Sequence, residues 1–217
     1  MLVLNHNEAS IIGTVIERDE THLIVSTKRL SGKEDKIMAC LPYRNPISGY
    51  LVGDRVHIFG SLRSYRKRGS GSTDSLHLFI EIRRIEMAKE GAEDENLINI
   101  TGYTNRIPEL RTTPLGKKVA DINISCQYKV LTNGRLIQDT IPCIAWNNVA
   151  EDICSSVKKN EFLRLFGRLE ERTYVKDDVT HSVNELSIIA GTLSTPLPNY
   201  DRVFEDKTLL SSVDDIE

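Results

Sequence analysis

The sequence predicts an all-β chain built from two tandem five-stranded barrels. Two observations indicate this class: short runs of alternating apolar and polar residues separated by turn-forming residues, and an internal repeat. A length of 217 residues suits one large domain or two small ones, and 40% hydrophobic with 27% charged residues is typical of a globular protein. No run approaches the roughly 20 apolar residues of a membrane helix, and residues 1–10 lack the pattern of a signal peptide. We therefore expect a cytoplasmic protein.

The internal repeat divides the chain into two units. We expect a first unit over residues 1–88, an acidic linker over 89–95, a second unit over 96–192, and an acidic, flexible tail over 193–217. The repeat rests on three matched pairs of segments, with Gly60 matching Gly167: residues 56–65 and 163–174, 11–15 and 100–104, and 76–82 and 182–189.

The second unit predicts five strands with a helix between the third and the fourth. Apolar residues alternate with polar ones from Ala120 to Cys126, which predicts a strand with one buried face. The helix is predicted over residues 148–159, where apolar residues recur every four positions and Asn148 with Glu151 resembles a capping box. This order of elements is that of an OB-fold, a five-stranded Greek-key barrel. The expected strands are 97–106, 118–128, 136–146, 161–171 and 181–190.

The first unit is the degenerate copy of this plan. Its matched glycines, Gly13 and Gly60, are 18 positions closer together than Gly102 and Gly167. Its connector between the third and fourth strands, residues 43–53, contains proline and glycine and cannot form a long helix.

Net charge at first argues against a nucleic-acid partner, because the whole chain carries −3. The distribution of charge reverses this argument. The net charge is +3 over residues 1–86 and +1 over 96–190, but −3 over 87–95 and −4 over 191–217. The acidity lies in the linker and tail, and both barrels are mildly basic.

The hairpin between the fourth and fifth strands of the first unit is the first candidate nucleic-acid contact. Arg63, Tyr65, Arg66, Lys67 and Arg68 precede a Gly/Ser-rich turn, in one of the loops with which OB-folds hold oligonucleotides. We expect the basic residues of this cluster to contact phosphate and the tyrosine to stack on a base. The alternative is an ordinary solvated hairpin.

The second unit offers a different set of candidates. Ile144 and Trp146 alternate with apolar residues of the third strand and so are predicted on its outer face, where a tryptophan suits base stacking; burial in the core is an equal alternative for a lone tryptophan. Its hairpin offers Arg168, Arg172 and Tyr174 among several acidic residues. Phe59 and Phe166, on the outer face of the fourth strands, suit either base stacking or a subunit interface.

Catalytic and metal-binding patterns are not found in the sequence. It contains no Walker loop, nucleophile elbow, zinc-protease or dinucleotide motif, and its five histidines form no pair at ligand spacing. The four cysteines form no C-x-x-C pair and are expected to be reduced core thiols. We expect no enzyme activity, no cofactor and no metal site.

Three segments in order, GYTNRIPELRTTPLGKKVA (102–120), IPCIAWNNVAE (141–151) and GRLEERTY (167–174), resemble the successive motifs of bacterial single-stranded DNA-binding proteins. Together they span nearly all of residues 97–192, whereas the first unit resembles the family only through Gly13 and residues 60–65. The resemblance implies two OB-folds that bind single-stranded DNA without sequence specificity, in replication, recombination or repair. It assigns base stacking to Trp146 and Tyr174, and phosphate neutralisation to Arg106, Arg111, Lys117 and Arg172.

Assembly and partners follow from the same resemblance. Members of the family typically assemble four OB-folds, so a chain with two implies a homodimer. Their tails dock replication and repair proteins through an acidic run that ends in Pro-Phe; here the chain ends DDIE (214–217), acidic but without Pro-Phe. An alternative function is a scaffold of a primosome-like or mobile-element replication complex, with the first barrel as a protein-interaction module. RNA is a weaker alternative ligand, because no feature of the sequence recognises a 2′-hydroxyl.

Overall fold

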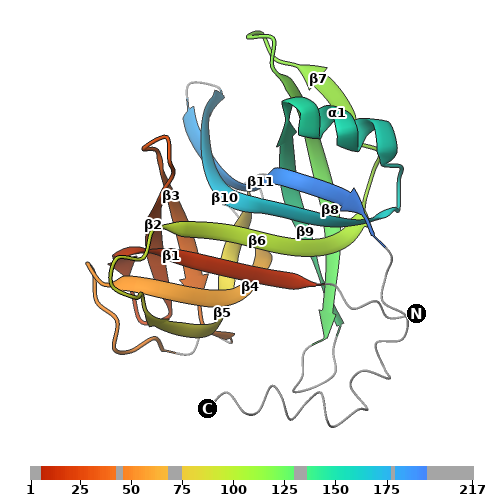
Figure 1. Cartoon of the computed structure of the whole chain (residues 1–217). Coiled ribbons are helices and arrows are strands. Elements are labelled where there is room, and N and C mark those ends of the chain that lie inside the picture. Colours follow the sequence, from red (N-terminus) through yellow and green to blue (C-terminus); the bar gives the residue numbers. More distant parts are fainter. Residues whose placement is uncertain (1–5, 43–45, 68–74, 130–135, 177–178, 195–217) are drawn as a thin grey trace.

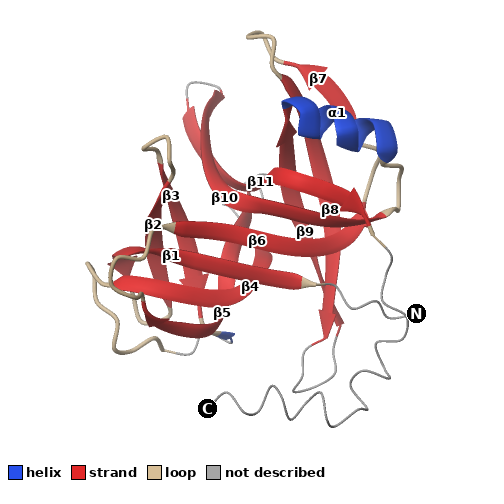
Figure 2. Ribbon diagram, in the orientation of Figure 1, coloured by secondary structure: helices blue, strands red, loops and turns tan. Residues whose placement is uncertain are grey.

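The computed structural model describes residues 6–42, 46–67, 75–129, 136–176 and 179–194, and within them it is all-β with one helix (Figure 2). The predicted class is confirmed. The first unit contains β1 (Asn7–Arg18), β2 (His22–Lys28), β3 (Glu34–Cys40), β4 (Arg55–Lys67) and β5 (Ser75–Met87). The second contains β6 (Glu95–Thr104), β7 (Glu109–Thr112), β8 (Lys118–Lys129), β9 (Leu136–Trp146), α1 (Asn147–Ser156), β10 (Phe162–Lys176) and β11 (Val179–Leu193).

Each unit closes into a five-stranded barrel with the same strand order. In the first, β1 pairs with both β2 and β4, and β3 pairs in parallel with β5. In the second, β6 pairs with both β8 and β10, and β9 pairs in parallel with β11. One parallel pair among antiparallel ones is what the Greek-key path of the OB-fold requires, so the prediction of two tandem OB-folds is correct.

The two barrels share one continuous sheet through β1 and β6. These strands pair antiparallel, with Ala9 opposite Ile98, Asn7 opposite Ile100 and Ile11 opposite Asn96. Because Ile11 and Ile100 occupy equivalent positions in the repeat, this register places a local two-fold axis at the Ala9 and Ile98 pair. Strands β5, β4, β1, β6, β10 and β11 consequently run side by side across the molecule (Figure 1).

Two asparagines repeat the same bridge on either side of this axis. The side-chain amide of Asn7 donates to Leu62 O at 2.8 Å and its oxygen accepts from Leu62 N at 2.8 Å. Asn96 makes the matching pair of bonds to Leu169, at 2.8 and 3.0 Å. Each asparagine thus extends the hydrogen bonding between the first and fourth strands of its own barrel.

Gly60 and Gly167 are matched because the fourth strand approaches the fifth too closely for a side chain. A Cβ at Gly60 would lie 2.3 Å from Glu81 O, and a Cβ at Gly167 would lie 2.3 Å from Ser187 O. Each glycine follows a β-bulge, between Phe59 and Gly60 in β4 and at the equivalent step in β10. The bulge and the close contact bend the strand so that the barrel closes.

The predicted helix is present but starts and ends earlier than expected. α1 covers Asn147–Ser156 and buries Ala150 and Ile153, whereas the sequence predicted residues 148–159. The expected capping box is wrong: Trp146 is the N-cap residue and no side chain caps the helix. The reason is local, because β9 runs directly into α1 and Asn147, at φ 50°, makes the turn.

The remaining differences from the predicted elements are small. β10 extends to Lys176 and β11 begins at Val179, so the hairpin of the second barrel is longer than predicted. A short strand that the sequence did not predict, β7, pairs with the start of β8. Residues 195–217, where we expected a flexible tail, lie outside the described residues.

The linker is held against the first barrel. Arg55 donates to Asp94 Oδ1 at 2.6 Å and to Ala92 O at 2.9 Å, and the backbone N–H of Lys28 donates to Asp94 Oδ2 at 2.6 Å. One carboxylate therefore joins β2 and β4 to the chain between the barrels.

The cores of the two barrels are continuous and consist mainly of isoleucine, leucine and valine. Cys126 and Cys143 are buried, Cys40 and Cys154 are partly buried, and none of the four forms a disulfide. Burial raises the pKa of the Cys126 and Cys143 thiols. Among the described residues, no helix is long and apolar enough to span a membrane.

Candidate nucleic-acid interface

Trp146 lies in a row of three side chains across the outer face of the second barrel. Arg111 on β7 is opposite Val119 on β8, and Val119 is opposite Trp146 at the end of β9. Residues directly opposite each other on paired strands share a face, so the tryptophan and the arginine flank the same valine. Trp146 is half-buried and Arg111 is exposed. The predicted outer-face position of Trp146 agrees with this register, and the row combines a stacking ring with a cation.

Three candidate arginines of the second barrel are ion-paired to carboxylates of the same barrel. Arg111 pairs with Asp121, Arg168 with Glu170 at 2.6 Å, and Arg172 with Glu185 at 2.9 Å. The arginine side chains are 39–57% exposed. Asp121 is 43% exposed, so its pair with Arg111 is a surface pair worth about 0–1 kcal/mol, which an incoming phosphate can displace at little cost. Glu170 and Glu185 are only 16% and 12% exposed, so displacing them costs more. The acidic partners also reduce the positive field around these arginines.

The other candidates of the second barrel lie at its ends. Arg106 and Lys117 are exposed and precede β7 and β8 respectively. Tyr174 lies on β10 opposite His181, and its side chain is outside the described part of the structure. The arrangement therefore places Arg111 and Trp146 on either side of Val119, which is itself buried. Arg106 and Lys117 lie on the segments that flank β7.

The hairpin of the first barrel carries a cluster of aromatic rings. Tyr65 stacks on His77 with ring centroids 5.2 Å apart and planes 19° apart, and its edge meets Phe79 at 5.7 Å. Tyr65 is 37% exposed and Arg66 beside it is exposed. Sequence reasoning found Tyr65 and missed His77 and Phe79. His77 and Phe79 alternate with buried residues on the fifth strand, and this alternation could have placed both rings on the outer face beside Tyr65.

Two basic candidates of this hairpin lie wholly or partly outside the described residues. Lys67 is the last residue of β4, but its side chain is not described, and Arg68 lies beyond the described segment.

Arg63, which the sequence placed among the nucleic-acid contacts, is buried instead. It is 8% exposed and pairs with Glu81 at 2.9 Å and with Asp139 of the second barrel at 2.5 Å. Burial raises the pKa of Asp139 despite the lowering effect of Arg63. Arg63 thus joins the two barrels, and we leave it out of the proposed interface. The local cluster of basic residues could not reveal this, because Asp139 is 76 positions away.

The register of the strands also corrects the alignment of the two hairpins. Gly60 is opposite Ile82 and Gly167 is opposite Ile188, and neither hairpin has a further bulge. Counting outward from these glycines, Tyr65 occupies the position of Arg172, not that of Tyr174. The sequence match had aligned the two tyrosines by allowing a two-residue gap.

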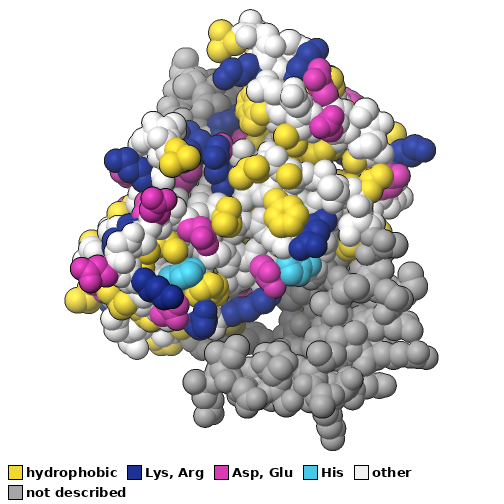
Figure 3. Space-filling view, in the orientation of Figure 1, with side chains coloured by type: hydrophobic (Ala, Val, Ile, Leu, Met, Phe, Trp, Pro, Cys, Tyr) yellow, Lys and Arg dark blue, Asp and Glu magenta, His cyan; other side chains and the backbone are white. Residues whose placement is uncertain are grey.

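Phe59 and Phe166 lie on the six-stranded face that crosses both barrels. Arg84 lies over the Phe59 ring at 4.1 Å, and Arg164 lies over the Phe166 ring at 5.0 Å. Phe166 is 42% exposed and Leu97 is 52% exposed. Figure 3 shows hydrophobic side chains gathered on this face among basic, acidic and histidine side chains. This face is distinct from the row that contains Trp146.

Residues 95–195 match the model of the single-strand binding protein family. This segment contains the whole second barrel and the Trp146 row. The second barrel is therefore similar to members of this family. Among curated relatives, single-stranded DNA-binding protein A of Bacillus subtilis is 33% identical over 81 residues, which is 36% of this chain and 46% of the relative. Single-stranded DNA-binding protein 2 of Listeria monocytogenes is 30% identical over 84 residues, 38% of this chain and 52% of the relative.

These sequence matches span about half the length of the curated relatives. Structural similarity extends over both barrels. The crystal structure of the wild-type single-stranded DNA binding protein from Thermus aquaticus has a TM-score of 0.67 at 17% identity, covering 90% of this chain and 96% of that one. A deletion mutant of the same protein gives 0.67 at 15% identity, covering 91% and 98%. The fold of the first barrel, which the family model does not match, is therefore also found in these structures.

Proposed function

We propose that this protein binds single-stranded DNA without sequence specificity and protects it in the cytoplasm during replication, recombination or repair. The observation that carries the proposal is the row of Arg111, Val119 and Trp146 within the segment that matches the family. We propose no catalytic step, since stacking and charge neutralisation account for the chemistry of this face.

Base stacking and phosphate contacts would both contribute to DNA binding by the second barrel. A base placed on Trp146 would contribute about 1–3 kcal/mol, whatever its identity, because every base has a π-face. Arg111 would exchange Asp121 for a phosphate, as would Arg168 and Arg172 with their carboxylates. Binding would release counterions and so weaken steeply as salt rises.

A fluorescence titration tests this function. Trp146 is the one tryptophan of the chain, so oligo-dT should quench the intrinsic fluorescence at low salt, and raising the salt concentration should reverse the quenching. Duplex DNA of equal length is the control and should quench weakly. Unchanged fluorescence together with no mobility shift at low salt would refute the proposal.

We further propose that the protein forms a homodimer through the six-stranded face. Phe59, Phe166 and Leu97 supply apolar area there, and β1 and β6 join the two barrels into one continuous sheet across this face. Light scattering should give twice the chain mass, and Phe59→Glu with Phe166→Glu should give a folded monomer. A wild-type chain that is monomeric at micromolar concentration would contradict this assembly.

The scaffold function is less well supported. The two barrels should not be separated to test it, because cutting between β5 and β6 would expose the unpaired edges of β1 and β6. Substitutions in the full chain separate the two functions better.

A further inference from the structure

β7 is the outermost strand of the sheet and has one free edge. It pairs with β8 on one side, and among the described strands none pairs with its other side. All the residues of β7 are exposed. Figure 1 places the strand at one end of the molecule, beside α1. An exposed strand edge is a template for pairing with another chain.

The ladder between β7 and β8 determines which backbone groups the free edge presents. Just beyond β7, the N–H of Thr113 donates to Lys117 O at 2.8 Å, so Thr113 bonds toward β8. In an antiparallel pair, residues that bond to the partner strand alternate with residues that do not. Arg111, two positions before Thr113, therefore also bonds toward β8. The N–H and C=O groups of Leu110 and Thr112 consequently point toward the free edge.

The charges on β7 make this edge complementary to itself. Glu109 and Arg111 lie on one face of the strand, on either side of Leu110. When two copies of β7 pair antiparallel with their Leu110 residues opposite each other, Glu109 of each copy lies opposite Arg111 of the other. The two Leu110 residues then exchange hydrogen bonds, and the charged residues occupy the closer, non-hydrogen-bonded positions, with Cα atoms about 4.5 Å apart. Opposite charges at such positions stabilise the pairing of strands.

Glu109 has no cation within the described part of its own chain. The residue opposite it on β8 is Asp121, and like charges directly opposite each other are unfavourable. Arg111 pairs with Asp121, and no ion pair of Glu109 is found among the described residues. A guanidinium group carries five N–H donors, so Arg111 of a second copy can contact Glu109 and keep its own Asp121. Pairing of two copies would thus supply the cation that Glu109 lacks.

Leu110 adds an apolar contact at the centre of the same pairing. It lies opposite Ala120 of β8, which is fully buried, yet Leu110 itself is 41% exposed. Leu110 therefore lies at the rim of the core of the second barrel. Leu110 of a second copy, directly opposite on the same face, would cover this exposed part and remove apolar area from water.

We propose that β7 pairs with β7 of a second copy of this chain, antiparallel about a two-fold axis at Leu110. The edge occurs once per chain, because the first barrel joins β1 to β2 through residues 19–21 alone, which the structure describes in full. The contact is isologous and separate from the six-stranded face, so the two interfaces together would link homodimers into an open string. This inference goes beyond the proposed function and does not depend on DNA binding.

The pairing is expected to be weak on its own. β7 has four residues, and Pro108, which precedes it, has no N–H with which to extend the ladder. Stable interfaces bury about 1,200–2,000 Å², more than two such short strands can supply. We therefore expect association at high protein concentration, or where copies are held side by side, as on one DNA strand.

Cross-linking in the absence of DNA tests the pairing. In Leu110→Cys the two new thiols would lie within reach of a short bis-maleimide reagent, because the Cα atoms of a hydrogen-bonded pair are about 5.5 Å apart. We expect cross-linked dimers whose yield rises with protein concentration. Leu51→Cys, at a leucine that is 63% exposed and lies far from β7 in the sequence, is the matched control. It should give no more product than the wild type, whose own cysteines are buried or partly buried.

Substitutions on β7 separate strand pairing from non-specific contact. Leu110→Pro removes an outward N–H and keeps the bonds between β7 and β8. It should lower the association constant between dimers, measured by sedimentation at high concentration, about tenfold or more, while Leu110→Val should retain association. Glu109→Arg should lower the constant about fivefold or more by placing like charges opposite each other. Adding Arg111→Glu should restore it, because the exchanged charges are again complementary and Asp121 lies opposite the new arginine.

Circular dichroism and Trp146 fluorescence check that each variant is folded. Equal association constants for the wild type, Leu110→Pro and Glu109→Arg would overturn the pairing, as would a yield of cross-linked Leu110→Cys no higher than that of the wild type. Failure of Arg111→Glu to restore the association of Glu109→Arg would overturn the register at Leu110. Either result can occur while oligo-dT still quenches Trp146, so the proposed function would remain standing.

Discussion

The two barrels share a backbone plan but differ in the chemistry of their outer faces. At equivalent hairpin positions the first barrel has Tyr65 and Phe79, which are in ring contact, and the second has Arg172 and Glu185, which form an ion pair. At the end of the third strand the relation is reversed: the second barrel has Trp146 where the first has Pro42. Each barrel thus has aromatic side chains on its outer face, at different places. The difference shows that duplication kept the barrel and left the outer face to diverge.

The contact between the barrels shows the same divergence in its charges. Asp35 and Asp139 occupy equivalent positions on the third strands, as the parallel pairings place Ala39 with Cys143. Asp139 pairs with Arg63 of the other barrel, but the position equivalent to Arg63 holds Glu170. Asp35 therefore needs another cation, and Arg29 supplies it while also reaching Glu170 at 3.3 Å. Two different ion-pair networks fill two matching sites.

The largest expected effect follows from removing Arg63. Arg63→Ala leaves Asp139 buried without its closest cation, which should lower the free energy of unfolding by about 3–5 kcal/mol. Arg168→Ala should cost under about 1 kcal/mol, because Glu170 keeps its second cation, Arg29. Urea denaturation monitored by circular dichroism measures both. Equal effects would contradict the buried role of Arg63.

The glycine pair tests whether the two barrels are equivalent in their backbones. Gly60→Ala and Gly167→Ala should each destabilise the protein by about 1–3 kcal/mol, since each new Cβ meets a carbonyl oxygen of the fifth strand. Thermal unfolding of the two variants provides the comparison. A large loss for one and none for the other would break the equivalence.

Substitutions at Trp146 and at the equivalent Pro42 test whether the two barrels differ in base stacking at the end of the third strand. Trp146→Ala should weaken binding of oligo-dT by about 1–3 kcal/mol through lost stacking, Trp146→Phe should lose less, and Pro42→Ala should have little effect. Fluorescence anisotropy of a labelled oligonucleotide measures all three. Full affinity in Trp146→Ala would remove this residue from the interface.

The pKa of Asp139 predicts a pH effect specific to the junction. Burial raises this pKa above its ordinary value of 3.8, so the folded protein binds the proton more tightly than the unfolded chain. The contribution of Asp139 to stability should therefore increase as pH falls through the raised pKa toward 3.8 and be lost as pH rises. Asp139→Asn should lack this dependence. We expect the unfolding free energy of the wild type, relative to Asp139→Asn, to rise between pH 7 and pH 4.

The smallest expected effect concerns Arg172. Arg172→Gln should reduce the slope of log affinity against log salt by less than about 1, because Glu185 already neutralises part of its charge. Titrations at several salt concentrations measure this slope. Glu185→Gln is the matched control and should steepen it.

Much of this organisation follows from the sequence alone. The alternation of apolar residues and the matched glycines determine two barrels of five strands, because strand periodicity and close backbone approach are local properties. The motifs of residues 102–174 likewise carry the similarity of the second barrel to single-stranded DNA-binding proteins. The outer-face position of Trp146 follows from the alternation of apolar residues along one strand.

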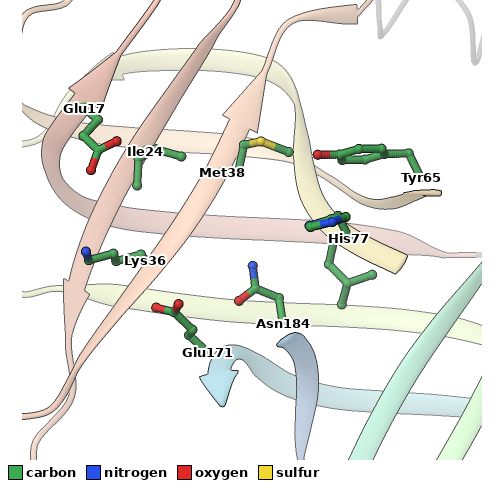
Figure 4. Close-up of a pocket in the computed structure, with 9 residues that line it drawn as sticks. Glu17, Ile24, Lys36, Met38, Tyr65, His77, Glu171 and Asn184 are labelled. Atoms are coloured by element: carbon green, nitrogen blue, oxygen red, sulfur yellow. The ribbon is translucent and has the colours of Figure 1, made fainter. Parts of the chain in front are cut away.

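Contacts between distant segments were decided only by the tertiary structure. The sequence predicted Arg63 in an exposed basic cluster, but folding buried it against Asp139. The sequence match also aligned Tyr65 with Tyr174, whereas the strand registers make Tyr65 equivalent to Arg172. A cavity of about 250 Å³ between the barrels depends on the same packing, because Glu171 and Asn184 of the second barrel line it together with residues of the first barrel (Figure 4). Periodicity assigns a residue to a face of its own strand, but which residues meet across two faces depends on strand register and on how the barrels pack.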